Sequence, residues 1–166
     1  MTALQSKHRE RAMRHGTTQA EAMFRQKFAR FEKLVAEMTE ERAWEKMLEG
    51  YPERQKQHMG AFIETATLAE GLTKAIPLFK QMGMDMEVFD ISNQHVDAVL
   101  EVQRTCPALS LCQEYGLSKP CRVICELDVE ATRRAFPGMT GEILSRQADG
   151  ACVCVFKYER RMPAEV

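Results

Sequence analysis

Along the first half of the chain, apolar residues recur every three or four positions, which is the spacing of a helix with one buried face. A first stripe follows the capping pair Thr18 and Glu21 and consists of Phe24, Phe28, Phe31, Val35 and Met38. Thr39 can cap a short second helix around Trp44, which Gly50 closes. The pattern therefore predicts that this half of the protein is helical.

A third helix is expected to begin at Pro52, because proline suits the first helical turn. It is expected to end or kink at residues 75–76, just before Pro77. Its apolar stripe consists of Met59, Phe62, Ile63, Ala66, Ala69, Leu72 and Ile76. Stripes of this kind generally pack in a core, so we assign no cofactor to it.

After Gly83 the apolar residues alternate with polar ones, as in strands with one buried face. In the strand predicted over residues 96–102, the apolar side is formed by Val96, Ala98, Leu100 and Val102, opposite Asp97, Glu101 and Gln103. The other expected strands span residues 84–88, 142–146 and 151–158, with a turn at Asp149-Gly150 between the last two. Helices are expected after Pro107 and from Pro120 to Pro137.

These elements predict an α+β fold, in which N-terminal helices are followed by an antiparallel sheet with two or three helices interleaved. A length of 166 residues suits one compact domain. Within it we expect an arm at 1–17 that is flexible or loosely helical, a helical region at 18–83 and a cysteine-rich α+β unit at 84–166. The N-terminal helices are also the expected contact surface of a homodimer.

The charge and the missing motifs narrow the function classes. A formal net charge of −1 predicts neither nucleic acid nor a membrane surface as a partner. No signal peptide or long apolar run is recognisable, which predicts a cytoplasmic protein whose thiols stay reduced. The chain has no Gly-x-Gly-x-x-Gly, P-loop or Gly-x-Ser-x-Gly motif to support nucleotide binding or a serine hydrolase. Its four histidines are expected at the surface.

The candidate chemistry lies in the last third of the chain, which holds all six cysteines: Cys106, Cys112, Cys121, Cys125, Cys152 and Cys154. Cys121 and Cys125 share one face of a predicted helix with Asp128, and Glu126 lies about a quarter-turn away. Cys152 and Cys154 are expected to project to the same side of a strand. Cys106 precedes a helix whose N-terminus would lower its pKa.

Three interpretations of this cluster stay open. In the first it binds a metal, and the thiolate ligands would be Cys106, Cys121, Cys125 and Cys154. Glu126 or Asp128 would add an oxygen ligand, and zinc suits such a set better than an iron–sulfur cluster, because no ferredoxin-like spacing is present. In the second, a thiolate at Cys106 or Cys125 attacks an electrophilic carbon while a carboxylate manages protons. In the third, the cysteines are packing residues, which we favour for Cys112 and Cys152.

Several short motifs of this region carry a family likeness. They are Cys106-Pro107, Tyr115-Gly116-Leu117, Cys121, Cys125-x-x-Asp128, Pro137-Gly138 and the segment 149–156. In this order they resemble the L-2-amino-thiazoline-4-carboxylic acid hydrolase family, over residues 20–160. The family name implies that water opens a cyclic thiazoline to give an N-carbamoyl cysteine.

The resemblance implies a hydrolase that acts on a C–N or C–S bond of a small sulfur-containing or amidine-like cyclic compound. Cys106, Cys125, Asp128 and Glu126 would form its catalytic site, with or without help from a metal. Arg104 and Arg122 lie near the cysteines in the sequence and would hold a substrate carboxylate.

A second likeness gives an alternative function. The C-terminal part resembles the 4-vinyl reductase domain, which holds zinc through cysteines and an acidic residue beside a ligand pocket. It implies a non-catalytic protein that binds a small molecule or a metal, either zinc or an iron–sulfur cluster. A cavity open to solvent, with a carboxylate hydrogen-bonded to a thiol, would favour the enzyme. A closed apolar cavity would favour the binding protein.

Overall fold

The computed structural model describes residues 19–115 and 120–161, and the predicted arm at 1–17 lies outside this range. In chain order the helices of the first half are α2 (Gln19–Glu37), α3 (Glu40–Leu48), α4 (Tyr51–Ile63) and α5 (Leu68–Gln81). The second half contains β1 (Asp85–Asp90), β2 (Val96–Thr105), α6 (Leu109–Tyr115), η1 (Pro120–Val123), α7 (Cys125–Ala135), β3 (Met139–Ser145), η2 (Gln147–Asp149) and β4 (Cys154–Arg161). The predicted α+β fold is confirmed.

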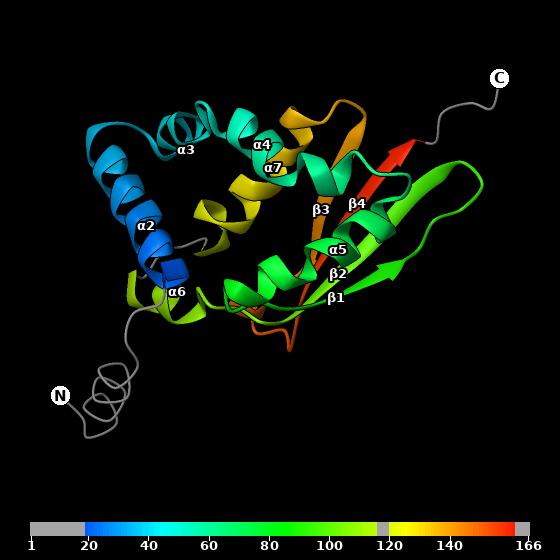
Figure 1. Ribbon diagram of the computed structural model, residues 1–166. Coiled ribbons are helices and arrows are strands. Elements are labelled where there is room, and N and C mark those ends of the chain that lie inside the picture. The colour runs from blue at the N-terminus through cyan, green and yellow to red at the C-terminus, as the bar shows by residue number, and fades with distance from the viewer. Residues whose placement is uncertain (1–18, 116–119, 162–166) are drawn as a thin grey trace.

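The four strands form one antiparallel sheet in the order β1-β2-β4-β3. Its helix-covered face carries α5 over β1 and β2, and α7 over β3, while α4 packs against both helices. Figure 1 shows the helices α2, α3 and α4 arranged beside and above the sheet, with α5 running along it. No helix of the described part is long and apolar enough to cross a membrane.

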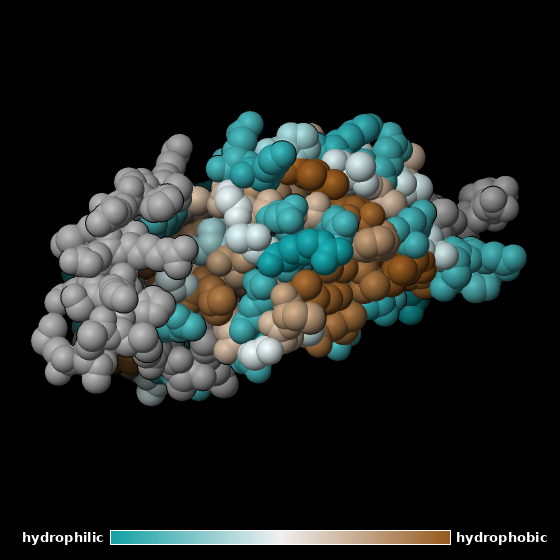
Figure 2. Space-filling model, turned by 90° about the horizontal axis from the view of Figure 1, so that it is seen from below, coloured by the Kyte–Doolittle hydropathy of each residue, from teal (hydrophilic) through white to brown (hydrophobic). Residues whose placement is uncertain are grey.

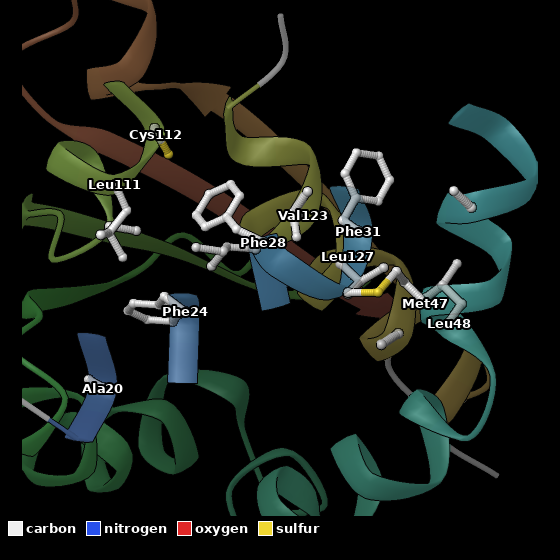
Figure 3. Packing of buried hydrophobic residues seen from close by; sticks show 14 residues of the cluster. Ala20, Phe24, Phe28, Phe31, Met47, Leu48, Leu111, Cys112, Val123 and Leu127 are labelled. Atoms are coloured by element: carbon white, nitrogen blue, oxygen red, sulfur yellow. The ribbon is translucent and has the colours of Figure 1, made fainter. Parts of the chain in front are cut away.

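The apolar stripe of α2 forms the main core, as predicted. Phe24, Phe28 and Phe31 are buried against α3, α6 and α7. Figure 3 shows Phe28 between Leu111 on α6 and Leu127 on α7, in one cluster with Phe24 and Phe31. The helices beside the sheet are therefore joined to one another by side chains that a helical period alone could identify.

The predicted third helix is wrong in its extent, because the chain turns between Ile63 and Leu68 and forms α4 and α5 instead. Thr67 caps α5 by accepting a hydrogen bond from the Glu70 amide. Gly71 then lies so close to α4 that an added Cβ would stand 1.6 Å from the Phe62 carbonyl oxygen. Pro77, expected to end or kink a helix, lies inside α5.

The buried side of β2 also differs from the expectation. Asp97, Glu101 and Gln103 are buried on the side of the helices, together with Val99. Of the predicted apolar side, Ala98 is buried, but Val96, Leu100 and Val102 are only half-buried. The polar residues thus face the protein interior. The alternation of β2 was predicted correctly, but the side expected to face solvent, with two carboxylates and an amide, is the side that faces the helices.

The protein surface is mixed in character. Figure 2, a view from below, shows apolar side chains gathered in patches among hydrophilic ones. The large apolar residues with the greatest exposure in the described part are Met23, Val35, Leu78, Phe89, Ile91 and Leu144. They are spread over helices and strands alike.

Candidate functional site

A cavity of about 660 Å³ lies between the helices and the sheet. This volume is in the range of small-molecule sites. Its walls are mainly apolar, and seven methionines contribute to them: Met23, Met47, Met59, Met82, Met84, Met86 and Met139. The exposed side chains of Arg54 and His58 also line it, so the cavity opens to solvent.

Three of the predicted site residues line this cavity: Cys106, Cys125 and Asp128. Cys106 follows the end of β2, and Cys125 begins α7, on which Asp128 lies one turn later. The other candidates, Cys121, Cys154, Glu126, Arg104 and Arg122, are not part of the cavity wall. The structure therefore divides the predicted set into cavity residues and residues behind or outside the wall.

The cavity thiols each hydrogen-bond a second thiol outside the cavity wall. Cys106 donates to Cys154, which is close because the register pairs Gln103 near the end of β2 with Cys154 at the start of β4. Cys125 donates to Cys121 on the preceding 3-10 turn. All six cysteines are free thiols. Four thiols thus form two pairs. The helix predicted to run continuously from Pro120 is interrupted at Ile124, so Cys121 and Cys125 lie on separate helical segments.

The hydrogen bonds within the two thiol pairs shift the pKa values of all four cysteines. The pKa of Cys106 is raised by its hydrogen bond to Cys154 and by burial, although the Ala108 amide acts in the opposite direction. The expected lowering at Cys106 is therefore wrong. The pKa of Cys154 falls to about 6, because it accepts hydrogen bonds from Cys106 and from the Gln147 amide, and Arg146 lies nearby. In the second pair, the hydrogen bond raises the pKa of Cys125 and lowers that of Cys121.

Asp128 belongs to a polar triad on the cavity wall. Tyr51 donates its hydroxyl hydrogen to Asp128 Oδ1, and Lys27 Nζ lies 2.5 Å from the Tyr51 oxygen and 3.3 Å from the same carboxylate oxygen. Burial, followed by the Asp128 charge, raises the pKa of Tyr51. The cavity is open, as an enzyme site should be, but the carboxylate bonds a phenol and an ammonium rather than a thiol.

Sequence reasoning also missed Glu101, a cavity residue of a different kind. Its side chain is 5% exposed and lines the cavity wall formed by the sheet. Burial raises its pKa to about 7, and Oε1 has no hydrogen-bond partner. The signal available in the sequence was a glutamate between Leu100 and Val102, but the apolar residues were assigned to the buried face.

The remaining candidates have partners outside the cavity. Arg104 pairs with Glu87 at 2.6 Å on the exposed side of the sheet. Arg122 stacks on the Trp44 ring and approaches Glu40. A third residue, Glu126, pairs with Arg146 at 2.9 Å. The cations that do line the cavity are Lys27, Arg30 and Arg54.

The two cysteines interpreted as packing residues differ. Cys112 is buried in the core formed by α2 and α6, as predicted. Cys152 is exposed and precedes β4, so its assignment to packing is wrong. Among residues 19–115 and 120–161, no group of three or more His, Cys, Asp or Glu side chains is placed to hold a metal ion.

Comparison with known proteins identifies one family. Its description is L-2-amino-thiazoline-4-carboxylic acid hydrolase, and it matches residues 3–158, nearly the whole chain. No curated protein and no solved structure matches the chain significantly. The match includes every residue of the cavity wall and agrees with a general hydrolase assignment. The chain belongs to the L-2-amino-thiazoline-4-carboxylic acid hydrolase family.

Proposed function

We propose that the protein hydrolyses a C–N or C–S bond of a small sulfur-containing or amidine-like cyclic compound inside the cavity. The observation that carries the proposal is the joint exposure of Cys106, Cys125 and Asp128 to one solvent-open space of about 660 Å³. Such a space accommodates a heterocycle and supplies a nucleophile beside proton-carrying groups. Family membership supports the reaction class.

Cys106 is the proposed nucleophile, because it lines the cavity and its thiol donates a hydrogen bond to Cys154, which can take the proton as the bond to carbon forms. Cys154 Sγ accepts a hydrogen bond from the backbone amide of Gln147 at 3.3 Å and lies near the positive charge of Arg146. As Cys106 Sγ bonds to the carbon between ring nitrogen and ring sulfur, its proton passes to Cys154. The ring C–S bond breaks, the ring sulfur takes a proton, and water then displaces Cys106 to give a carbamoyl product and the free thiol. Cys125, with Cys121 behind it, is the alternative nucleophile.

The polar triad would position the substrate and the water. Asp128 accepts from Tyr51, and Lys27 lies beside both, so a water molecule at the triad would meet a donor and an acceptor. A substrate carboxylate would be held by Lys27, Arg30 or Arg54, which line the cavity. These cations replace Arg104 and Arg122 in the proposal, because the latter two are occupied outside the cavity.

Zinc assistance, cytoplasmic location and a homodimer through the N-terminal helices stay predictions. No step is routed through a metal, because no group of three or more His, Cys, Asp or Glu side chains among the described residues is placed to hold one. Elemental analysis of protein purified without added metal checks the zinc prediction. Light scattering of the same sample checks the homodimer.

The test is an assay with L-2-amino-thiazoline-4-carboxylate and related cyclic amidines, with the carbamoyl product detected by mass spectrometry. Cys106→Ser should lower kcat by about a hundredfold or more, because an alcohol lacks the thiol's reactivity. Cys152→Ser is the matched control and should keep full activity, since Cys152 is exposed and outside the cavity. Full activity of Cys106→Ser together with Cys125→Ser would overturn the proposal, as would failure to convert any compound of the panel.

The apolar walls favour a second candidate, a binding protein without turnover. Methionine side chains adapt to ligands of different shape, and seven of them face the cavity. In the same incubations this candidate predicts a bound compound that is recovered unchanged. Product formation that depends on Cys106 or Cys125 would exclude it.

A further inference from the structure

Glu101 is a buried carboxylate on the cavity wall, and its Oε1 has no hydrogen-bond partner among the residues that the structure describes. It lies in the middle of β2, where the register places it between Val88 of β1 and Phe156 of β4. Tyr158, which is half-buried, follows on the same face of β4. No ion pair or hydrogen bond to Glu101 is formed by the residues that the structure describes, and Oε1 lacks any partner.

A carboxyl group in such a place is unfavourable for the protein alone. An unsatisfied buried acceptor costs about 1–3 kcal/mol, and native proteins leave few of them. Glutamine or leucine at the same point of the strand would avoid a buried charge. The cost becomes understandable if a ligand brings the missing donor, because the carboxyl already faces a space large enough for one.

We propose that Glu101 is the anchor of this cavity for a cationic head group with paired N–H donors, of the amidine or guanidine type. Two parallel N–H groups match the two carboxylate oxygens, and a charge-assisted pair is strongest where water is excluded. The apolar remainder of the ligand would lie against Met86 and Phe156, which line the wall on either side.

Other ligand heads fit this position less well. An anion would meet a carboxylate rather than a donor at this wall. A metal ion would need further ligands, and no set of three acidic, thiol or imidazole groups is gathered among the described residues. The opposite side of the cavity carries Lys27, Arg30 and Arg54, so an amidine that also bears a carboxylate would find complementary charge at both places.

The inference rests on the proposed function for its site, because it names the substrate class of the same cavity. Its test measures binding alone. The probe is benzamidine, compared with neutral benzamide of the same shape, in calorimetric titrations at pH 8 of the full chain. Glu101→Gln is the test variant, and Glu142→Gln, an exposed glutamate on β3, is the matched control.

We expect benzamidine to bind the unchanged protein and the Glu142→Gln variant equally, and to bind Glu101→Gln about tenfold more weakly or worse. Benzamide should bind Glu101→Gln at least as tightly as the unchanged protein, which also verifies that the variant retains its cavity. Equal benzamidine affinity with and without Glu101, or no benzamidine binding at all, would overturn the inference. If thiazoline turnover persists in that case, the proposed function still stands. Glu101-dependent benzamidine binding without any turnover would leave the inference standing and remove the proposed function.

Discussion

Two carboxylates on the helix-covered face of β2 lie four residues apart, and their surroundings are opposite. Asp97 accepts hydrogen bonds from the Leu68 amide at 3.1 and 3.0 Å, and from Arg160 Nε at 2.7 Å. Glu101 has an oxygen without a partner and faces the cavity. Both side chains are almost fully buried, at 1% and 5% exposure. Burial alone therefore does not distinguish a structural acid from a candidate binding group.

The difference lies in what surrounds each acid. Arg160 uses its other donors on the carbonyl groups of Ile63, Thr65 and Ala66, so the Asp97 cluster fixes the turn between α4 and α5 to β2 and β4. Every hydrogen-bond donor to Asp97 in this cluster is therefore supplied by the protein, and no ligand is needed to complete it. At Glu101 the described residues provide a wall and a space but no hydrogen-bond donor to Oε1, which is the arrangement expected of a site that awaits a ligand.

The largest expected effect is at Asp97. Asp97→Ala should lower the free energy of unfolding by about 3–5 kcal/mol, because it leaves the Arg160 charge without its buried partner and the Leu68 amide without its acceptor. Urea denaturation followed by circular dichroism measures this change. Arg134→Met, which breaks exposed ion pairs with Glu45 and Glu130, is the control and should hardly change the midpoint. A small change for Asp97→Ala would mean that Asp97 is not the structural acid of this strand.

The next effect separates Glu101 from Asp97 by pH. The Glu101 pKa is raised from 4.5 to about 7 in the folded protein, so the folded state holds this proton more tightly than the unfolded state. Its contribution to stability is therefore lost as pH rises from about 4.5 through about 7. Glu101→Gln cannot ionise and should exceed the unchanged protein in stability by on the order of 3 kcal/mol at pH 8, and by little at pH 4.

Urea titrations of both proteins across this pH range measure the difference, and groups that titrate equally in both cancel from it. A difference that stays constant with pH would show that the Glu101 carboxyl is solvated or already paired, and would remove the contrast with Asp97.

Periodicity predicted the helical first half, the strands and the α+β class, because local spacing reports which face of an element is buried. It could not predict which face of β2 is buried, since Asp97 and Glu101 are polar residues whose burial depends on Arg160 and on the cavity. The break between α4 and α5 was signalled by Thr67 and Glu70, a capping pair that the longer apolar stripe obscured.

The candidate site was predicted only where its residues are close in sequence. Cys125 and Asp128 were found together because they lie on one helix. Cys106 and Cys154 meet through the pairing of β2 with β4, and Lys27 and Tyr51 reach Asp128 across 101 and 77 positions of the chain. Contacts between residues so far apart in the sequence depend on the topology of the fold, so the spacing of residues in a single sequence does not predict them.

The smallest effect sharpens the structural side of the comparison. Thr67 caps α5 by accepting a hydrogen bond from the Glu70 amide, and Asp97 accepts one from the neighbouring Leu68 amide. Two side chains therefore serve as acceptors for the first turn of this helix. Thr67→Ala should lower the free energy of unfolding by about 1 kcal/mol, the usual cost of a lost N-cap. In a double-mutant cycle with Asp97→Ala, the two losses should fall short of additivity, because the helix start is already loosened when Asp97 is gone. Strict additivity in urea denaturation would show that Asp97 holds the sheet and Arg160 without fixing the start of α5.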